Sequence, residues 1–495
     1  MRSGRIRRRR LRIGTPCGVR RLLALVVVVA GARPSGAWEA ATTHAGLTEQ
    51  AALASVLHER LRVQFAQDKG VFQVLTVPPA DAADLFVVLR RLNPTHGYVP
   101  DNRGKLSALG WLVAGSVVAD TPEELAANHF FDPTTGSGLS SDSLHDILSR
   151  IRHRVVMAVN GAELERSGVA APAWIEHPRN PFGLAGFREQ YIKAVSARTP
   201  GERSRHLAGA LLAAGAIVHV LEDMGSPSHA RNDLAAHLDR LGPHPADVGS
   251  RFERVAALAY GRLGVPAPRK VIADRPLRAF FTAKDGSGLA DLTARSWFSE
   301  GTLPRPLDLG GNPRGALQRL PRTVERPAPV PPPDLDLDAA ASESGGKLMS
   351  RGGACLARYR VENRRLSWSI DDACALEQVS AILPTVSGYA AGMLDTLFRG
   401  TLALEADPAG GVLVRAGAVD LGPGTIHVYW DDPRGVRKQL AAHKVSGAAK
   451  GKVAIKVGMP PSDARRVSAL FDGVDGTRRP LLATGTSVVP FPGTE

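Results

Sequence analysis

The sequence predicts a mainly α-helical domain followed by a small, β-sandwich-like domain. Three observations carry this prediction. Apolar residues recur at helical spacing through residues 38–270, and residues 207–218 are apolar on every face. After residue 400 the pattern changes to short alternating runs separated by Gly, Pro and Asp turns.

The N-terminal segment has the composition of a signal peptide. Residues 1–37 contain ten arginines, no acidic residue, and an apolar core from Leu22 to Ala30 that is too short to span a bilayer. Small residues at Ser35 and Ala37 predict cleavage after Ala37. We therefore expect a secreted or periplasmic protein, exported by the general or the twin-arginine route, with no transmembrane helix in the mature chain.

The mature chain, from residue 38, divides into three parts by pattern. A helical domain is expected over 38–400, with helices over 47–66, 187–197 and 379–398 and a proline-rich insertion over 304–341. A β-rich domain is expected over 401–495, with strands at 411–415, 425–430, 453–457 and 466–471. Cys355 and Cys374 either form a disulfide in an oxidising compartment or remain two buried thiols.

The charge of the mature chain gives no reason to expect nucleic acid as a partner. The full sequence has a net charge of +14, but without the ten signal arginines 52 basic residues face 48 acidic ones. The resulting charge of +4 provides no strong field for a polyanion. We expect a monomer without a stable nucleic acid partner.

A possible metal site lies at the end of the apolar segment, which continues as His219-Val-Leu-Glu-Asp223. On a helix, residues four apart share a face, so His219 and Asp223 can hold one ion. Gly225 and Pro227 then end the helix and allow His229 to turn back. An alternative is a buried His219–Asp223 hydrogen-bonded pair with His229 on a surface loop.

Further candidate ligands come from two other segments. Cleavage after Ala37 would free the amine of Trp38, which with its own carbonyl oxygen can chelate an ion, and His44 follows closely. Asp120 closes another apolar run, and His129 follows it in a His-Phe-Phe-Asp-Pro segment. Each segment is a weak signal alone, and their combination indicates a metal centre.

Together these segments resemble the zinc-dependent phospholipase C family and, more distantly, the three-zinc single-strand-specific nucleases. The family's order of ligands is matched, and the resemblance implies that zinc is bound by Trp38, His44, Asp120, His129, His219, Asp223, His229 and Glu253. It also implies a helical zinc-phospholipase-like fold, with Asp223 bridging two ions and Asp120 orienting a water. These two aspartates are the expected catalytic residues.

Three departures from the family pattern are present. Gly249 stands where the family has a histidine, so the third zinc site is weak, absent, or completed by His237 or His244. Thr121 replaces an aromatic residue of choline-preferring members. The five residues between Trp38 and His44 make a shorter gap than in typical phospholipases, closer to the nucleases.

The resemblance implies an exported zinc phospholipase C with two or three zinc ions, acting on phospholipid at a membrane surface. It would cleave glycerophospholipids to diacylglycerol and a phosphorylated head group. The alternatives are a single-strand nuclease or nucleotidase on the same fold, and a non-catalytic zinc-binding surface protein. Head-group preference is left open by the sequence.

Overall fold

The computed structural model describes residues 40–92, 98–121, 123–139, 168–237, 250–303, 306–308, 334–335, 346–349 and 353–489. The predicted signal peptide, Trp38, His244 and Gly249 lie outside these residues. Of the predicted insertion over 304–341, only 306–308 and 334–335 are described.

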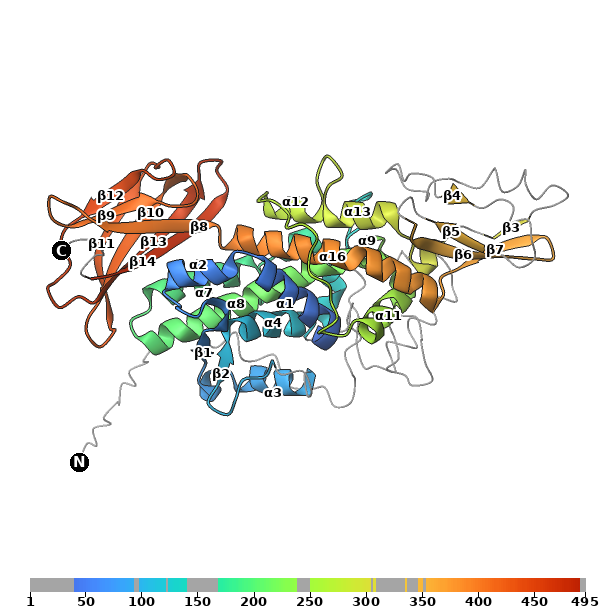
Figure 1. Ribbon diagram of the computed structural model, residues 1–495, viewed down its shortest axis with the longest axis horizontal. Helices are drawn as coiled ribbons and strands as arrows, with labels where there is room; N and C mark the ends of the chain where they lie inside the picture. Colours follow the sequence, from blue (N-terminus) through green and yellow to red (C-terminus); the bar gives the residue numbers. More distant parts are fainter. Residues whose placement is uncertain are drawn as a thin grey trace, which may run out of the picture.

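The predicted combination of a mainly helical part and a β-rich C-terminal part is confirmed (Figure 1). The helices, in chain order, are α1 (Ala45–Ala54), α2 (Leu57–Phe65), α3 (Ala83–Leu92), α4 (Ala108–Val118), α6 (Ala171–Trp174), α7 (Leu184–Ser196), α8 (Pro200–Glu222), α9 (Pro227–Ala230), α10 (Leu234–His237), α11 (Arg251–Ala259), α12 (Leu277–Phe281), α13 (Leu289–Ser296) and α16 (Asp372–Leu397).

Helix α8 is the centre of the helical part, and α4, α7 and α16 pack against it (Figure 1). It begins with a capping box in which Thr199 and Glu202 satisfy each other's backbone N–H groups. A window of the helical segment 200–225 has the length and hydropathy of a membrane span, yet 94% of that window is buried inside the protein. It is therefore a core helix.

Two glycines allow α4 and α8 to cross with their backbones in contact. A Cβ atom on Gly115 would lie 2.0 Å from the carbonyl oxygen of Leu212, and one on Gly215 would lie 1.9 Å from that of Leu112. Any larger residue would push the helices apart, because packed interiors do not absorb such overlaps without backbone shifts. Gly215 lies four residues before His219 on α8, and Gly115 lies five residues before Asp120, which follows α4.

The predicted helix over 47–66 is two helices. Helix α1 ends at Ala54, and α2 begins at Leu57 after a break at Ser55, whose backbone is extended. The predicted helices over 187–197 and 379–398 correspond to α7 and the longer α16.

The C-terminal part forms one seven-stranded sheet in the order β11-β10-β13-β14-β8-β9-β12, whose edge strands β11 and β12 touch. Within this sheet, as far as the structure describes it, β14 and β8 pair in parallel and the other neighbouring strands pair antiparallel. Alternate residues of the sheet fill an apolar core that contains Ile426, Val428 and Phe471. The strands are β8 (Gly400–Ala406), β9 (Val412–Ala416), β10 (Leu421–Asp431), β11 (Arg437–Val445), β12 (Val453–Val457), β13 (Arg466–Asp475) and β14 (Pro480–Val488).

Two further sheets were not predicted. A two-stranded sheet pairs β1 (Val74–Thr76) with β2 (Lys105–Ser107). A five-stranded sheet in the order β3-β7-β6-β5-β4 joins the described parts of the proline-rich region to the start of α16. Its strands are β3 (Leu307–Asp308), β4 (Asp334–Leu335), β5 (Gly346–Met349), β6 (Cys355–Glu362) and β7 (Arg365–Ser369). Cys355 and Cys374 form a disulfide between β6 and α16, so the thiol alternative is wrong.

Candidate metal centre

The candidate ligands gather around the C-terminal end of α8. His219 lies in the last turn of that helix, and Asp223 begins the short 3-10 helix Asp223–Gly225 that follows it. Ser226 then adopts an extended conformation, and Pro227 begins α9, which contains His229. This reversal brings His229 back to the same end of α8, as predicted from Gly225 and Pro227.

The first cluster contains His44, His219 and Asp223. His44 ends the π-helix Ala40–His44, directly before α1. Its Nε2 atom lies 3.1 Å from Asp223 Oδ1, and its ring stacks on that of His219 with centroids 3.7 Å apart. All three side chains are completely buried.

The second cluster contains Asp120, His129 and His219. Asp120 follows α4, and His129 is the last residue of the 3-10 helix Glu123–His129. Asp120 Oδ1 lies 3.0 Å from His129 Nδ1, and Asp120 Oδ2 lies 3.3 Å from His219 Nε2.

Asp223, which belongs to the first cluster, also contacts the histidines of the second. Its Oδ1 atom faces His44, whereas its Oδ2 atom lies 3.0 Å from His129 Nδ1 and 3.4 Å from His219 Nε2. A carboxylate that presents one oxygen to each of two ligand groups has the geometry of a bridge.

The third cluster contains His229, His237 and Glu253. His229 Nε2 lies 3.6 Å from Glu253 Oε1, and His237 Nδ1 lies 3.6 Å from Glu253 Oε2. The Oγ atoms of Ser226 and Ser228 also donate to Glu253 Oε1. Of the two histidines considered as substitutes at Gly249, the structure places His237, at the end of α10, in this cluster. His244 lies outside the described residues.

The three clusters fit metal ions by distance and by chemistry. Within each one, the ligand atoms lie within 4.8 Å of one another. Two ligands about 2.1 Å from one tetrahedral zinc would lie about 3.4 Å apart, close to the 3.3–3.6 Å separations of His219 from Asp120 and of Glu253 from its two histidines. A mixed set of imidazole nitrogens and carboxylate oxygens suits zinc better than magnesium or calcium.

Unsatisfied polar atoms provide an independent indication. Among the described residues, several buried atoms of these side chains have no hydrogen-bond partner and only lie within ion-pair distance of other ligand atoms, although burying such atoms is costly. They are His44 Nε2, both carboxylate oxygens of Asp120, His129 Nε2, both ring nitrogens of His219, Asp223 Oδ1, His229 Nε2 and His237 Nδ1. Cations in the clusters would satisfy most of them at once.

The pKa shifts of the cluster residues also indicate that positive charge stabilises the clusters. Burial by itself would raise the pKa of Asp120, but His219 and His129 hold that pKa well below its usual range. Burial by itself would also raise the pKa of Glu253, but the neighbouring His237 lowers it to about 2. Burial by itself would lower the pKa of His219, but the negative charges of Asp120 and Asp223 raise it well above its usual value. The carboxylates are therefore anionic, and divalent ions would supply the charge that protonated histidines otherwise provide.

Glu222, which the sequence analysis did not select, orients one of the ligands. Glu222 Oε2 lies 2.7 Å from His44 Nδ1 and accepts a hydrogen bond from the Nδ1–H group, while Thr48 Oγ1 donates to Oε1 at 2.9 Å. The proton on Nδ1 leaves Nε2 of His44 free as a ligand atom. A charged residue in an otherwise apolar, buried helix was the available signal.

Replacing Glu222 with glutamine should weaken zinc binding by about 10- to 100-fold, because an amide accepts the proton of His44 less strongly than a carboxylate. Competition with a chromophoric chelator measures this affinity. Glu49→Gln is the matched control, since Glu49 on neighbouring α1 accepts from Tyr98 and contacts none of the clusters. Equal zinc affinity in the wild type and Glu222→Gln would contradict the orienting role.

The structure brings together all seven predicted ligands that it describes, and Trp38 lies outside the described residues.

No family model matches the chain, and no curated protein matches it. Among the solved structures that are similar to this chain, two have a TM-score of 0.26 each. "Alpha Toxin from Clostridium Absonum" is 12% identical, and 92% of this chain covers 99% of that chain. The alpha-toxin of a Clostridium perfringens avian strain is 10% identical, with 92% and 98% covered. These scores are too low to establish a common fold, so function is inferred from the site itself.

Proposed function

We propose that this chain is an exported zinc-dependent phosphodiester hydrolase, specifically a phospholipase C. The observation that carries the proposal is Asp223, which presents its two oxygens to two adjoining clusters of buried histidines and Asp120. Paired metal sites of this kind are suited to displacement at phosphorus.

The ligand residues have different proposed roles in the reaction. Zinc, when bound, lowers the pKa of a water toward 7 and neutralises the phosphate oxygens. His44, His129 and His219 would hold the two ions with Asp223 between them. Asp120 remains a carboxylate, and its oxygens would ligate and accept a hydrogen bond from the attacking water. His229, His237 and Glu253 would hold a third ion.

The proposed substrate is a glycerophospholipid at a membrane surface, cleaved to diacylglycerol and a phosphorylated head group. The resemblance of the ligand segments to zinc-dependent phospholipases C supports this substrate class over nucleic acid. The near-neutral mature charge supports the same choice. Signal cleavage after Ala37 and export belong to this proposal, because the amine of Trp38 becomes a ligand only after processing.

A second candidate is a zinc-binding protein without catalytic activity. It is favoured by the burial of the clusters among the described residues, with at most 6% of any ligand side chain exposed. A catalytic zinc requires a position open to substrate, whereas a structural zinc is enclosed by protein ligands.

The test is an assay of the mature protein, beginning at Trp38, on vesicles of phosphatidylcholine or phosphatidylethanolamine and on single-stranded DNA. Elemental analysis counts zinc in the same preparation. We expect lipid hydrolysis with two or three zinc ions. Zinc without turnover would support the non-catalytic alternative, and cleavage of DNA alone would establish a nuclease.

The role of the N-terminal amine has its own prediction. One extra residue before Trp38 should remove the metal that this amine holds and lower activity by orders of magnitude, since the chelate requires a free α-amine. Zinc content and lipid turnover are compared with those of a variant carrying one extra residue after Glu495. Full activity of the N-terminally extended protein would remove the amine from the mechanism.

A further inference from the structure

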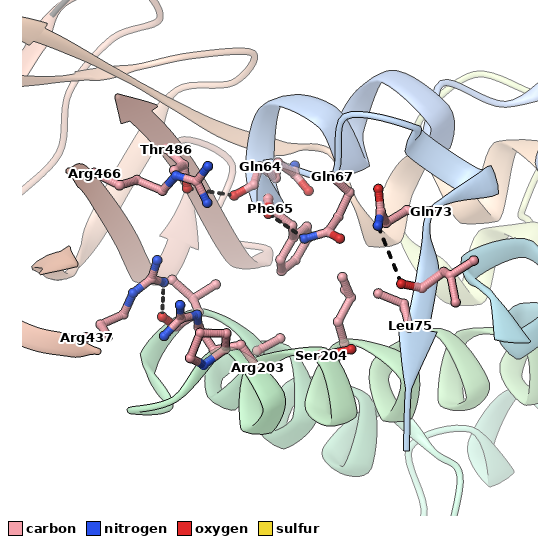
Figure 2. A pocket seen from close by; sticks show the side chains of 15 residues that line it. Gln64, Phe65, Gln67, Gln73, Leu75, Arg203, Ser204, Arg437, Arg466 and Thr486 are labelled. Carbon is pink, nitrogen blue, oxygen red and sulfur yellow. Dashed lines mark hydrogen bonds between the residues drawn. The ribbon is translucent and has the colours of Figure 1, made fainter. Parts of the chain in front are cut away.

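A second polar site lies where the helical part meets the C-terminal sheet. A cavity of about 270 Å³ opens between α2, α8 and β1 on one side and β11, β13 and β14 on the other (Figure 2). Figure 2 shows three arginines around it: Arg203 from α8, Arg437 from β11 and Arg466 from β13. None of these residues belongs to the metal centre.

Positive charge exceeds negative charge around this cavity. Asp431 accepts two hydrogen bonds from Arg437, at 2.7 and 2.8 Å, and lies 3.6 Å from Arg203. It is the one carboxylate paired with these arginines among the described residues. The three guanidinium groups and Asp431 together give an excess of two positive charges. Glu202 does not line the cavity and acts on Arg203 more weakly than Asp431 does.

Two of the arginines are held in fixed positions. The Nη1 atom of Arg437 donates to the carbonyl oxygen of Val195, and Arg203 donates to the carbonyl oxygens of Ala197, Arg198 and Gly435. The Arg437 and Arg203 side chains are only 6% and 14% exposed. Burial and the charge of Arg437 lower the pKa of Arg203 to about 10, as expected where cations are incompletely neutralised.

Arg466 differs from these two. Its half-buried side chain lines the cavity and has no hydrogen-bond or ion-pair partner in the part of the chain that the structure describes. An anion in the cavity would provide the acceptor that this guanidinium lacks among the described residues.

We propose that this cavity binds a small phosphate-bearing anion. A phosphate group at neutral pH carries a charge close to −2, which matches the excess of two positive charges, and arginines are suited to its oxygens. Neutral groups complete the lining. Ser204 Oγ accepts the backbone N–H of Thr76 at 2.9 Å and keeps its own hydroxyl proton to donate, and Gln67 and Gln73 also line the cavity.

Such a ligand would connect the two parts of the molecule, because Arg203 comes from the helical part and Arg437 and Arg466 come from the sheet. It goes beyond the proposed hydrolase activity and does not depend on it. The test therefore measures binding and not turnover.

Isothermal titration calorimetry of the zinc-loaded mature protein with inorganic phosphate tests the proposal. Arg466→Ala should weaken phosphate binding at this site by about tenfold or more, the loss expected for one charge-assisted hydrogen bond. Arg465→Ala, which removes the same charge from the adjacent, exposed residue outside the cavity, should bind as the wild type does. Phosphate that binds at the zinc ions would do so equally in the wild type, Arg466→Ala and Arg465→Ala. It therefore does not contribute to the difference between these proteins.

Equal phosphate binding by the wild type and Arg466→Ala would overturn the proposal. Binding of acetate as tightly as phosphate would overturn the assignment to a phosphate-bearing ligand. Arg466→Lys should recover only part of the affinity, because lysine keeps the charge but lacks the planar fork. The melting temperature of each variant without phosphate shows that the protein is folded.

Discussion

Asp223→Asn is expected to lower hydrolytic turnover on the order of a thousandfold or more and to reduce the bound zinc. The asparagine has nearly the same shape, but it lacks the negative charge that faces both His44 and His129. Metal ions contribute several kcal/mol to transition-state stabilisation, and each 1.4 kcal/mol corresponds to about tenfold in rate. Lipid turnover and elemental analysis of the same preparation measure both effects.

Asp291→Asn is the matched control for this substitution. Asp291 accepts hydrogen bonds from Thr282, Ala283 and Gly288 and has no contact with the three clusters. This control should reduce stability while zinc content and activity per folded molecule are retained. If Asp223→Asn kept its zinc and its turnover, the bridging role of Asp223 would be wrong.

Removal of zinc by a chelator is expected to abolish activity and to lower the melting temperature by several degrees. The buried oxygens of Asp120 and the nitrogens of His219 have no hydrogen-bond partner among the described residues, so a metal-free protein would retain this cost. A ligand present at a thousand times its dissociation constant stabilises the folded state by about 4 kcal/mol per site. Differential scanning calorimetry with and without chelator measures the shift.

Added zinc should restore both the melting temperature and the activity, whereas magnesium should restore neither, because it prefers oxygen ligands. An unchanged melting temperature after complete removal of zinc would show that the clusters are stable without metal. That result would contradict the coupling of folding to metal binding, whereas the proposed role of zinc in catalysis would still stand.

The main features of the fold and site were predictable because they depend on local patterns. The apolar run before His219 indicates a buried helix, and the four-residue spacing to Asp223 puts both ligands on one face. The strands after residue 400 follow from alternation. The break between α1 and α2 was missed because neither glycine nor proline marks it, and Ser55 simply becomes extended.

Other features depend on contacts between distant residues and leave no local signal. His237 lies sixteen residues before Glu253 in the sequence, at a position where the family pattern predicts no ligand. Only the placement of α10 brings it into the third cluster. The cavity arginines lie on α8, β11 and β13, and only the packing of the sheet against the helices brings them together. The small sheet that includes β6 and β7 was not predicted, because the neighbouring proline-rich sequence is typical of a loop.

The close crossing of α4 and α8 has a consequence for ion selectivity. Main-chain atoms of the two helices are in contact at Gly115 and Gly215, so the backbones that carry His219 and lead to Asp120 are held close together. Calcium needs six to eight oxygen ligands at 2.3–2.6 Å and a pocket that can widen. Because the two backbones are already in contact, widening the pocket would require the helices to repack, and we expect the crossing to disfavour an ion that needs a wider pocket.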